Sequence, residues 1–468
     1  MLASDESSRW RDTERNDGGV DIGETHHTRW FYPGLNEADG APGSYRVDED
    51  GSVEVHVFET FDTGGSFTLV PDEDFPDILL GEVFREAVSL FGCRVVAGKT
   101  GVTSQQDLLI RPDYAIEGSI YLTSDDDLRV TSLRLRFTDQ DAWTNWKPFS
   151  IERRRKADGL EYASATLARP VDLEAVVDGG RLKLTDDSYV HEDVITHKTE
   201  LQGQSRFEYL LNEPLPIQDA MSRYGYPLQV LLLTATGYMP GAISMRATNP
   251  AWVEGLENSP LHTEWVTLRR FHGGHRGLLP NSLGYLHRLE DFDFEVQLPE
   301  VLASVTKHRL AFERYAEMLS KQAGGNLSKF VDLTQVIDAY DRSNHPDEKR
   351  SGAFYVPLER MDSEVGNFVA DIVDVTDRWA FYVGKLRNIV VHGDPRARDL
   401  VADPRPLHAA FEALSLLFEA NLLVGFGFTV TRARELVESR HPYWAREKNI
   451  RENFPVLVDF IGEDPPDN

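Results

Sequence analysis

The run FYVGKLRNIVVHGDPRARDL, from Phe381 to Leu400, is the most informative part of the C-terminal sequence. Apolar residues repeat at helical spacing before and within it: Val365, Phe368, Ile372, Val375, Trp379, Tyr382 and Leu386. We therefore expect one long amphipathic helix that begins near Ser363, a suitable N-cap. It should end at Gly393, a suitable C′ residue, because Pro395 cannot continue a helix.

Inside this stretch Arg387 and Asn388 are followed by three apolar residues and His392. Arginine is a fixed planar cation that suits phosphate, and histidine has a proton that is mobile near neutral pH. On one ideal helix the two side chains would point roughly 140° apart. A shared site therefore requires either that the last turn unwinds or that two copies of the motif meet across a symmetric dimer.

The segment resembles the Arg-x4-6-His motif of HEPN ribonucleases, in which a polar residue commonly follows the arginine, as Asn388 does here. The resemblance implies a small α-helical bundle that pairs with a second copy and cuts RNA without metal or other cofactor. It also implies that Arg387, Asn388 and His392 are the catalytic residues.

A structural interpretation of the same residues stays open. Arg387 could be a cation that interacts with the carbonyl dipole at a helix end, and His392 could be a polar cap.

The overall charge contrasts with the charge of the motif. The chain of 468 residues has a formal net charge of −28, which is unusual for a protein that meets RNA. Only 11 of the 49 basic residues are lysine, and an acidic, lysine-poor composition suits a protein that is soluble in concentrated salt. Around the motif, however, Lys385, Arg396 and Arg398 make the segment cationic, so we predict that they contact RNA.

Length and cysteine content limit the class of protein. A chain of this length is expected to form two or three domains. A single cysteine, Cys93, excludes an internal disulfide and a thiolate zinc cluster. We see neither an export signal nor an apolar run long enough to span a membrane, so we expect a cytoplasmic protein without membrane contact.

The N-terminal half has the sequence pattern of a β-rich domain. Residues 1–27 are polar and without periodicity, which predicts a disordered tail. Between about Trp30 and Trp265, short β-branched and aromatic runs alternate with Gly, Pro and Asp. We assign residues 28–298 to one β-rich α+β domain.

This region also resembles the N-terminal domain of ApeA-like anti-phage proteins. The resemblance rests on ordered landmarks: Trp30 to Gly34, Gly43, the strand at 52–58, Ala87 to Cys93, Phe137, Trp143, Glu213 to Ile217 and Leu231 to Gly237. In that family the domain precedes a HEPN domain with an Arg-Asn-x3-His motif, which is the order found here.

Residues 299–468 have the sequence pattern of a helical bundle. Apolar spacing predicts helices from Val301 to Leu319, from Phe330 to Tyr340, the motif helix, a helix that opens at Asp403 and Pro404, and one over 429–448. The predicted fold class is therefore α+β, with a β-rich domain followed by an all-α bundle.

Two acidic residues in the second of these helices differ from the related family. Asp338 and Asp341 stand where this HEPN group usually has Glu and His. We favour a solvated polar face over a role in catalysis for this helix.

Two other signals are set aside. The run Ala97-Gly98-Lys99-Thr100 lacks the first glycine of a phosphate loop, because Cys93 occupies that position, and we expect a hairpin turn. A stretch rich in His and Arg has no usual zinc spacing and is expected to be a loop that touches RNA or the partner domain: His262, Arg269, Arg270, His272, His275, Arg276 and His287.

The sequence thus predicts a defence endoribonuclease that uses the RNA 2′-OH and leaves a 2′,3′-cyclic phosphate. Its partners would be RNA, of which transfer RNA is one frequent target in the family, and a second copy of the bundle. A phage-derived trigger would act on the N-terminal domain. The alternative is a non-catalytic RNA-binding or antitoxin-like module.

Overall fold

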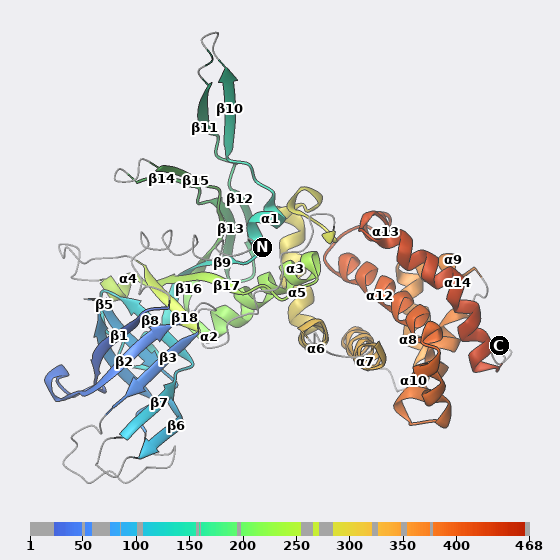
Figure 1. The fold of residues 1–468 in the computed structure, drawn as a ribbon, viewed down its shortest axis with the longest axis horizontal. Coiled ribbons are helices and arrows are strands. Elements are labelled where there is room, and N and C mark those ends of the chain that lie inside the picture. The colour runs from blue at the N-terminus through green and yellow to red at the C-terminus, as the bar shows by residue number, and fades with distance from the viewer. Residues whose placement is uncertain are drawn as a thin grey trace.

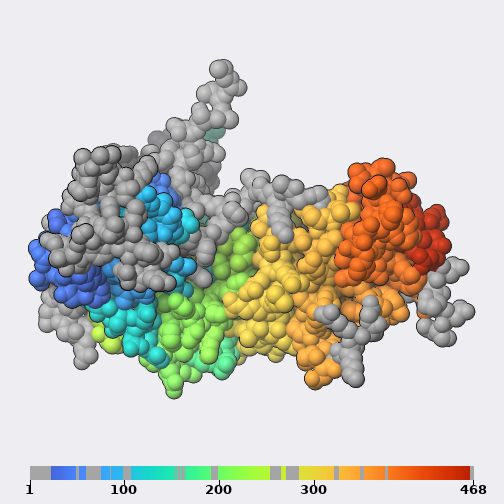
Figure 2. All heavy atoms as spheres, turned by 90° about the horizontal axis from the view of Figure 1, so that it is seen from below, coloured from blue at the N-terminus to red at the C-terminus, as the bar shows by residue number. Residues whose placement is uncertain are grey.

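A computed structural model describes most of the chain. The described residues are 23–48, 52–58, 75–84, 86–100, 106–155, 159, 161–193, 198–253, 265–270, 284–320, 326–347, 353–374 and 378–463. A β-rich region at one end of the elongated molecule is followed by a helical region at the other end (Figures 1 and 2). The predicted α+β class, with strands first and helices second, is confirmed.

The β-rich region is built on a nine-stranded sheet in which every neighbouring pair is antiparallel. In spatial order its strands are β12 (Leu173–Val177), β13 (Gly180–Asp186), β16 (Ser205–Pro216), β9 (Arg129–Phe137), β17 (Ala242–Thr248), β18 (Val266–Arg270), β8 (Tyr114–Gly118), β5 (Glu86–Phe91) and β4 (Ile78–Val83). The long strand β16 is irregular between Leu210 and Leu215, where its register against β9 shifts.

A five-stranded sheet packs against the β4, β5 and β8 end of the large sheet. It consists of β1 (Thr25–Trp30), β2 (Ala41–Val47), β3 (Val53–Val57), β7 (Gln106–Arg111) and β6 (Arg94–Thr100). The two sheets enclose a core around Trp30, whose side chain is fully buried. Gly43 is required beside it, because an added Cβ would lie 2.5 Å from the indole Cδ1 atom.

Two sequence predictions differ from the structure in this sheet. Strand β1 begins at Thr25, within the predicted tail, whereas residues 1–22 lie outside the described residues. Residues 97–100 form the end of β6 and pair with β7, so the prediction of a hairpin turn there is wrong.

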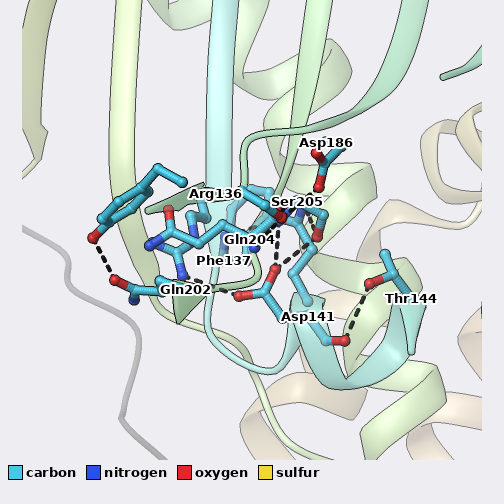
Figure 3. Close-up of polar contacts among 11 residues, drawn as sticks. Arg136, Phe137, Asp141, Thr144, Asp186, Gln202, Gln204 and Ser205 are labelled. Atoms are coloured by element: carbon cyan, nitrogen blue, oxygen red, sulfur yellow. Dashed lines mark hydrogen bonds and ion pairs between the residues drawn. The ribbon is translucent and has the colours of Figure 1, made fainter. Parts of the chain in front are cut away.

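Two β-ribbons extend from the large sheet (Figure 1): β10 (Phe149–Arg155) with β11 (Glu161–Leu167), and β14 (Tyr189–Asp193) with β15 (Lys198–Gln202). The second ribbon is anchored beside the short helix α1 (Gln140–Thr144), as Figure 3 shows. The Asp141 carboxylate accepts hydrogen bonds from the backbone N–H and the hydroxyl of Ser205 at 2.7 and 2.8 Å, and it pairs with Arg136 at 3.0 Å. This carboxylate thereby fixes the point where the ribbon returns to the sheet.

Helices join the large sheet to the helical region. The helix α2 (Ile217–Ala220), a π-helical turn (Met221–Gly225) and α3 (Tyr226–Thr236) run without a break, and almost all of α3 is buried. A further short helix is α4 (Pro250–Val253). Because α3 packs on α1 of the β-rich region as well as on α5 of the helical region, it belongs to both regions.

The helical region contains ten α-helices in the described part of the chain: α5 (Phe294–Lys307), α6 (Arg309–Ser320), α7 (Asn326–Asn344), α8 (Tyr355–Glu364), α9 (Phe368–Val373), α10 (Trp379–Val391), α11 (Asp399–Ala402), α12 (Arg405–Gly425), α13 (Val430–Ser439) and α14 (Tyr443–Ile461). The central helix α12 is apolar and long enough to cross a membrane, but it is mostly buried among the other helices. It is therefore a core helix of the bundle.

Three predicted helices are each divided in the structure. The predicted helix from Val301 to Leu319 starts earlier, at Phe294, and breaks at His308 between α5 and α6. The helix predicted over 429–448 is interrupted by Pro442, between α13 and α14, and the Thr429 side chain caps the start of α13. The motif helix is the third, and its division affects the site.

An aromatic cluster connects the sheet to the bundle. The His287 ring lies against Trp143, Phe292 and Phe428. The indole N–H of Trp143 donates to His287 Nδ1 at 3.4 Å, and Nε2 lies 3.4 Å from the Thr234 hydroxyl. Burial, together with the charge of Arg440, lowers the pKa of His287 to about 3, so this imidazole is neutral.

The His/Arg-rich stretch therefore does not behave as one loop. His287 is a core residue, and Arg269 in β18 pairs with the buried carboxylate of Glu117. The prediction of a loop is wrong for these two residues, whereas the predicted alternative of contact with the partner domain holds for His287, which lies against Phe428 of the helical region. Four other members lie outside the described residues: His262, His272, His275 and Arg276.

A largely buried ion cluster joins α12 to Arg440 and to α14. Glu419 of α12 is only 6% exposed and accepts from Arg440 at 2.9 Å and from Arg446 at 2.8 Å. Arg446 also binds Glu412, and Arg440 donates to the Gly284 carbonyl. Burial would raise the pKa of Glu419, but the two arginines outweigh it and hold the pKa below its usual value.

Candidate functional site

The segment that leads into the motif is three helices, so the prediction of one helix from Ser363 is wrong. Helix α8 ends at Glu364, and Gly366 and Asn367 follow with positive φ angles of 75° and 58°. Helix α9 ends at Val373, and the C-cap residue that follows, Asp374, has φ of 52°. An L-residue adopts this left-handed conformation only at some cost, so each such residue interrupts the helix.

The buried carboxylate of Asp362 holds the three helices together. It accepts from the backbone N–H groups of Val369 and Ala370 at 2.8 and 3.1 Å, at the start of α9. It also accepts from the indole N–H of Trp379, the first residue of α10, at 2.9 Å. Burial raises the pKa of Asp362 despite these donors. Sequence reasoning missed this residue, although the Gly366-Asn367 pair was a turn signal that could have revealed the break.

The C-terminal end of α10 is formed as predicted. Gly393 has φ of 68°, and the N–H of Asp394 donates to the Ile389 carbonyl at 3.1 Å, which is the hydrogen bond of a Schellman motif. The backbone N–H of His392 donates to the Asn388 carbonyl at 3.0 Å. The last turn is therefore intact and has not unwound toward Arg387.

Arg387 and Asn388 form a half-buried polar pair on α10. The Nη1 group of Arg387 donates to Oδ1 of Asn388 at 3.1 Å, and its guanidinium carbon lies 5.8 Å from the ring centroid of Phe354. In the described part of the chain, no carboxylate pairs with Arg387. Its positive charge is therefore available to an anion.

His392 lies one turn further on, as the exposed C-cap residue of α10. Because α10 is helical through Val391, the directions of Arg387 and His392 differ by roughly 140° on the helix surface. One copy of the chain thus presents the two groups on different sides of the same helix end.

The cations that flank the motif differ in their partners. Lys385 donates to Glu463 at 2.5 Å, and Arg396, in the 3-10 turn Pro395–Arg398, pairs with Asp394 at 3.1 Å. Arg398 is exposed, and among the described side chains it has no acidic partner. Two of the three predicted RNA contacts are thus partly neutralised by nearby carboxylates.

The acidic residues of α7 have structural partners. Asp338 pairs with Arg342 one turn along the same helix. Asp341 is buried, and its carboxylate lies 3.2 Å from Nε of Arg360 in α8. The structure thus gives Asp341 a role in joining α7 to α8.

The chemistry available at the end of α10 is therefore that of a guanidinium, an amide and an imidazole. Arginine can stabilise a phosphate as it gains charge, an amide can orient it, and an imidazole can move a proton. Within the described ranges, His, Cys, Asp and Glu side chains nowhere gather in a group of three that could hold a metal ion.

Comparison with known families is informative for the β-rich region. Residues 26–248 match the family described as ApeA N-terminal domain 1. No curated protein and no solved structure matches the chain. In chain order, the family match runs from β1 to the end of β17. It therefore includes the five-stranded sheet and all strands of the nine-stranded sheet except β18, and it ends before the helical region. The β-rich region of this chain is therefore similar to the N-terminal domain of ApeA, as its sequence landmarks predict.

Proposed function

We propose that this protein is an anti-phage endoribonuclease in which the helical region cuts RNA and the ApeA-like region controls it. The observation that carries the proposal is the half-buried Arg387–Asn388 pair, with no described carboxylate on the arginine, beside the exposed His392. Together with the ApeA-like domain that precedes it, this arrangement supports a HEPN-type site.

In the proposed reaction the RNA supplies its own nucleophile. His392 takes the proton from the 2′-OH as the oxygen attacks phosphorus, and the bond to the 5′-oxygen breaks. Arg387 stabilises the charge that develops on the phosphoryl oxygens, and Asn388 orients the phosphate or the imidazole. A second histidine, or water, returns a proton to the leaving oxygen. The products are a 2′,3′-cyclic phosphate and a 5′-hydroxyl.

The geometry of α10 supports a dimer as the active form. Because its last turn is intact, one chain does not direct Arg387 and His392 to one point. A two-fold pairing of bundles would place His392 of one copy beside Arg387 of the other. We therefore propose a homodimer through the helical region, with both motifs lining one groove that binds RNA.

The test combines expression, product analysis and chelation. Unrestrained wild-type protein should be toxic on expression, and His392→Ala should relieve the toxicity. RNA ends collected after induction should carry 2′,3′-cyclic phosphates, and cleavage by the purified protein should persist in excess EDTA. Activity that is lost on chelation and restored by Mg²⁺ would contradict the proposed chemistry. RNA binding without new RNA ends, in wild type and variant alike, would favour the non-catalytic RNA-binding module.

The β-rich region would serve as the sensor. We propose that it receives a phage-derived signal and restrains the bundle until that signal is present. A truncated chain without residues 1–253 is not a clean test, since α3 and the aromatic cluster around His287 belong to the shared core. Comparing toxicity of the full chain with and without phage infection is the appropriate experiment.

A further inference from the structure

A second place in the bundle has the features of a ligand site. A cavity of about 500 Å³ opens between the α5–α6 junction and α7. Figure 1 shows α6 and α7 as neighbouring helices in the middle of the molecule. This volume is within the range of sites for small organic ligands, and it is larger than a single phosphate ion needs. None of its lining residues belongs to the proposed RNA site.

The charge of the cavity favours an anion. Three cations line it, namely Lys307, Arg314 and Arg342, against a single carboxylate, Asp338, which Arg342 already pairs. Arg314 has no acidic partner within the described ranges, and Lys307 Nζ uses one donor on Asn344 at 2.6 Å. In a chain with net charge −28 this local excess of positive charge is unusual.

A buried histidine gives the cavity a hydrogen-bond acceptor. His308 is one of the residues that line the cavity, and its ring, in a residue only 4% exposed, stacks on Tyr340 with 4.0 Å between ring centroids. The Ser343 hydroxyl donates to the Tyr340 carbonyl at 2.8 Å, so its oxygen accepts from Nδ1 of His308. Burial and the charge of Lys307 lower the pKa of His308 to about 4, which keeps the ring neutral. A neutral ring with its proton on Nδ1 has a lone pair on Nε2.

These two features require different groups on one ligand. A phosphate suits the guanidinium of Arg314, but its oxygens would be repelled by a lone pair on His308 Nε2. That atom instead needs a hydroxyl or amino donor. The apolar side chains of Leu310, Ala311 and Ala339 form the remaining wall and suit a carbon skeleton.

We propose that this cavity binds a small phosphate ester that also carries hydroxyl groups, with the phosphate on Arg314 and Lys307 and a hydroxyl on His308. Sugar phosphates and nucleoside monophosphates share this chemistry. The site would join α6, which contacts α3, to α7, which packs against the motif helix α10. The proposal does not depend on the ribonuclease activity.

The experiment is calorimetric titration of the full chain with ribose 5-phosphate, AMP, adenosine and inorganic phosphate at fixed ionic strength. We expect ribose 5-phosphate or AMP to bind more tightly than both adenosine and inorganic phosphate, and the comparison of the two esters identifies the source. Arg314→Gln should weaken binding of the ester by about tenfold or more, the value of a charged hydrogen bond. Arg451→Gln, at an exposed ion pair on α14, is the matched control and should bind as wild type does.

Three outcomes would overturn the proposal. One is that neither ester binds at millimolar concentration, while the melting temperature shows that the protein is folded. Another is that inorganic phosphate binds as tightly as the esters, which would make the cavity a simple anion site. The third is that Arg314→Gln weakens RNA binding but leaves ester binding unchanged, which would place the cavity on the RNA path.

Discussion

Two groups of arginines in the helical region have opposite environments. Arg440 and Arg446 are bound to Glu419 inside the bundle, and each charge of this cluster has a partner of opposite sign. Arg387 is half-buried at the end of α10, where an amide and an aromatic ring are its described partners. The first arrangement uses the cation to hold helices together. The second leaves it able to receive an anion from outside the chain.

The comparison distinguishes arginines that stabilise the fold from an arginine that is available for binding or catalysis. A buried arginine whose carboxylate is removed becomes an uncompensated charge, and the fold loses free energy. An arginine without a carboxylate partner contributes little to folding, so its replacement should change binding or catalysis instead. The predictions below test this separation.

The largest expected effect is on cleavage. His392→Ala should lower the RNA cleavage rate by about 10²–10⁴-fold, the usual value of one acid-base group. Arg387→Ala should lower it as well and should also weaken RNA binding, because only the arginine is charged at every working pH. The melting temperature should hardly change in either variant. Near-normal cleavage by His392→Ala, or loss of activity only through unfolding, would assign the motif a structural role.

Removal of the buried carboxylate of Glu419 should lower the stability of the fold, rather than act first on cleavage. Glu419→Ala leaves Arg440 and Arg446 without their shared partner, and we expect unfolding free energy to fall by about 3–5 kcal/mol. Denaturant titration measures the loss. Arg405→Gln, which removes an exposed ion pair with Asp403, is the control and should change stability much less. Equal losses in the two variants would mean that the buried cluster is not a structural anchor.

Truncation of an apolar side chain in the motif helix should also act on stability. Leu386 precedes Arg387 in the sequence but is fully buried, and Leu386→Ala should cost about 2–5 kcal/mol. Thermal or denaturant unfolding gives the value. If this variant stayed as stable as wild type while losing cleavage, the division between the buried and exposed faces of α10 would be wrong.

The expected effect that is smallest, when it is expressed per pH unit, is a change in the pH dependence of stability. His287 has a folded pKa of about 3, far below the value of about 6.5 for an unfolded histidine, so the unfolded state binds the extra proton first. Its contribution therefore makes stability fall as pH decreases from about 6.5 toward 3, by about 1.4 kcal/mol per pH unit. His308, with a pKa of about 4, has the same sign.

The variant His287→Gln isolates this contribution. Glu86, whose pKa burial and Glu117 raise to about 7, acts in the opposite sense between about pH 4.5 and 7, so wild type alone does not resolve the histidine. The difference in stability between wild type and His287→Gln should be constant above pH 7 and should shrink as pH falls below about 6.5. A difference that is independent of pH would show that His287 does not stay neutral in the folded state.

Sequence reasoning predicted the parts of this molecule that depend on local pattern. The order of a β-rich and a helical region follows from periodicity, and the end of α10 follows from Gly393 and the proline after it. The division into α8, α9 and α10 could not be predicted in this way, because apolar residues from Val365 to Trp379 keep helical spacing although the helix is interrupted. The hydrogen bonds of Asp362 stabilise the interrupted arrangement. They join α8 to α9 and α10, and the sequence alone does not show that these residues lie together.

The motif residues were predicted from their spacing and from the resemblance to a known family. The side chains that surround them in the structure were not predicted. That Lys385 and Arg396 have acidic partners depends on Glu463 and Asp394, which the fold brings to them. The cavity beside α7 was not predicted either, because its cations come from three helices, α5, α6 and α7, and His308 lies inside a run whose apolar spacing predicts one continuous helix.

The core that runs unbroken from the large sheet through α3 and α5 to α14 has an evolutionary consequence. Sensor domains attached by a flexible linker can be exchanged between effectors by recombination at the linker. Here a crossover between the two regions would divide a packed interior that includes Trp143, His287 and Phe428, and each half would expose apolar surface. The β-rich region and the bundle must therefore change together, so that substitutions on one side of the aromatic cluster select for compensating substitutions on the other.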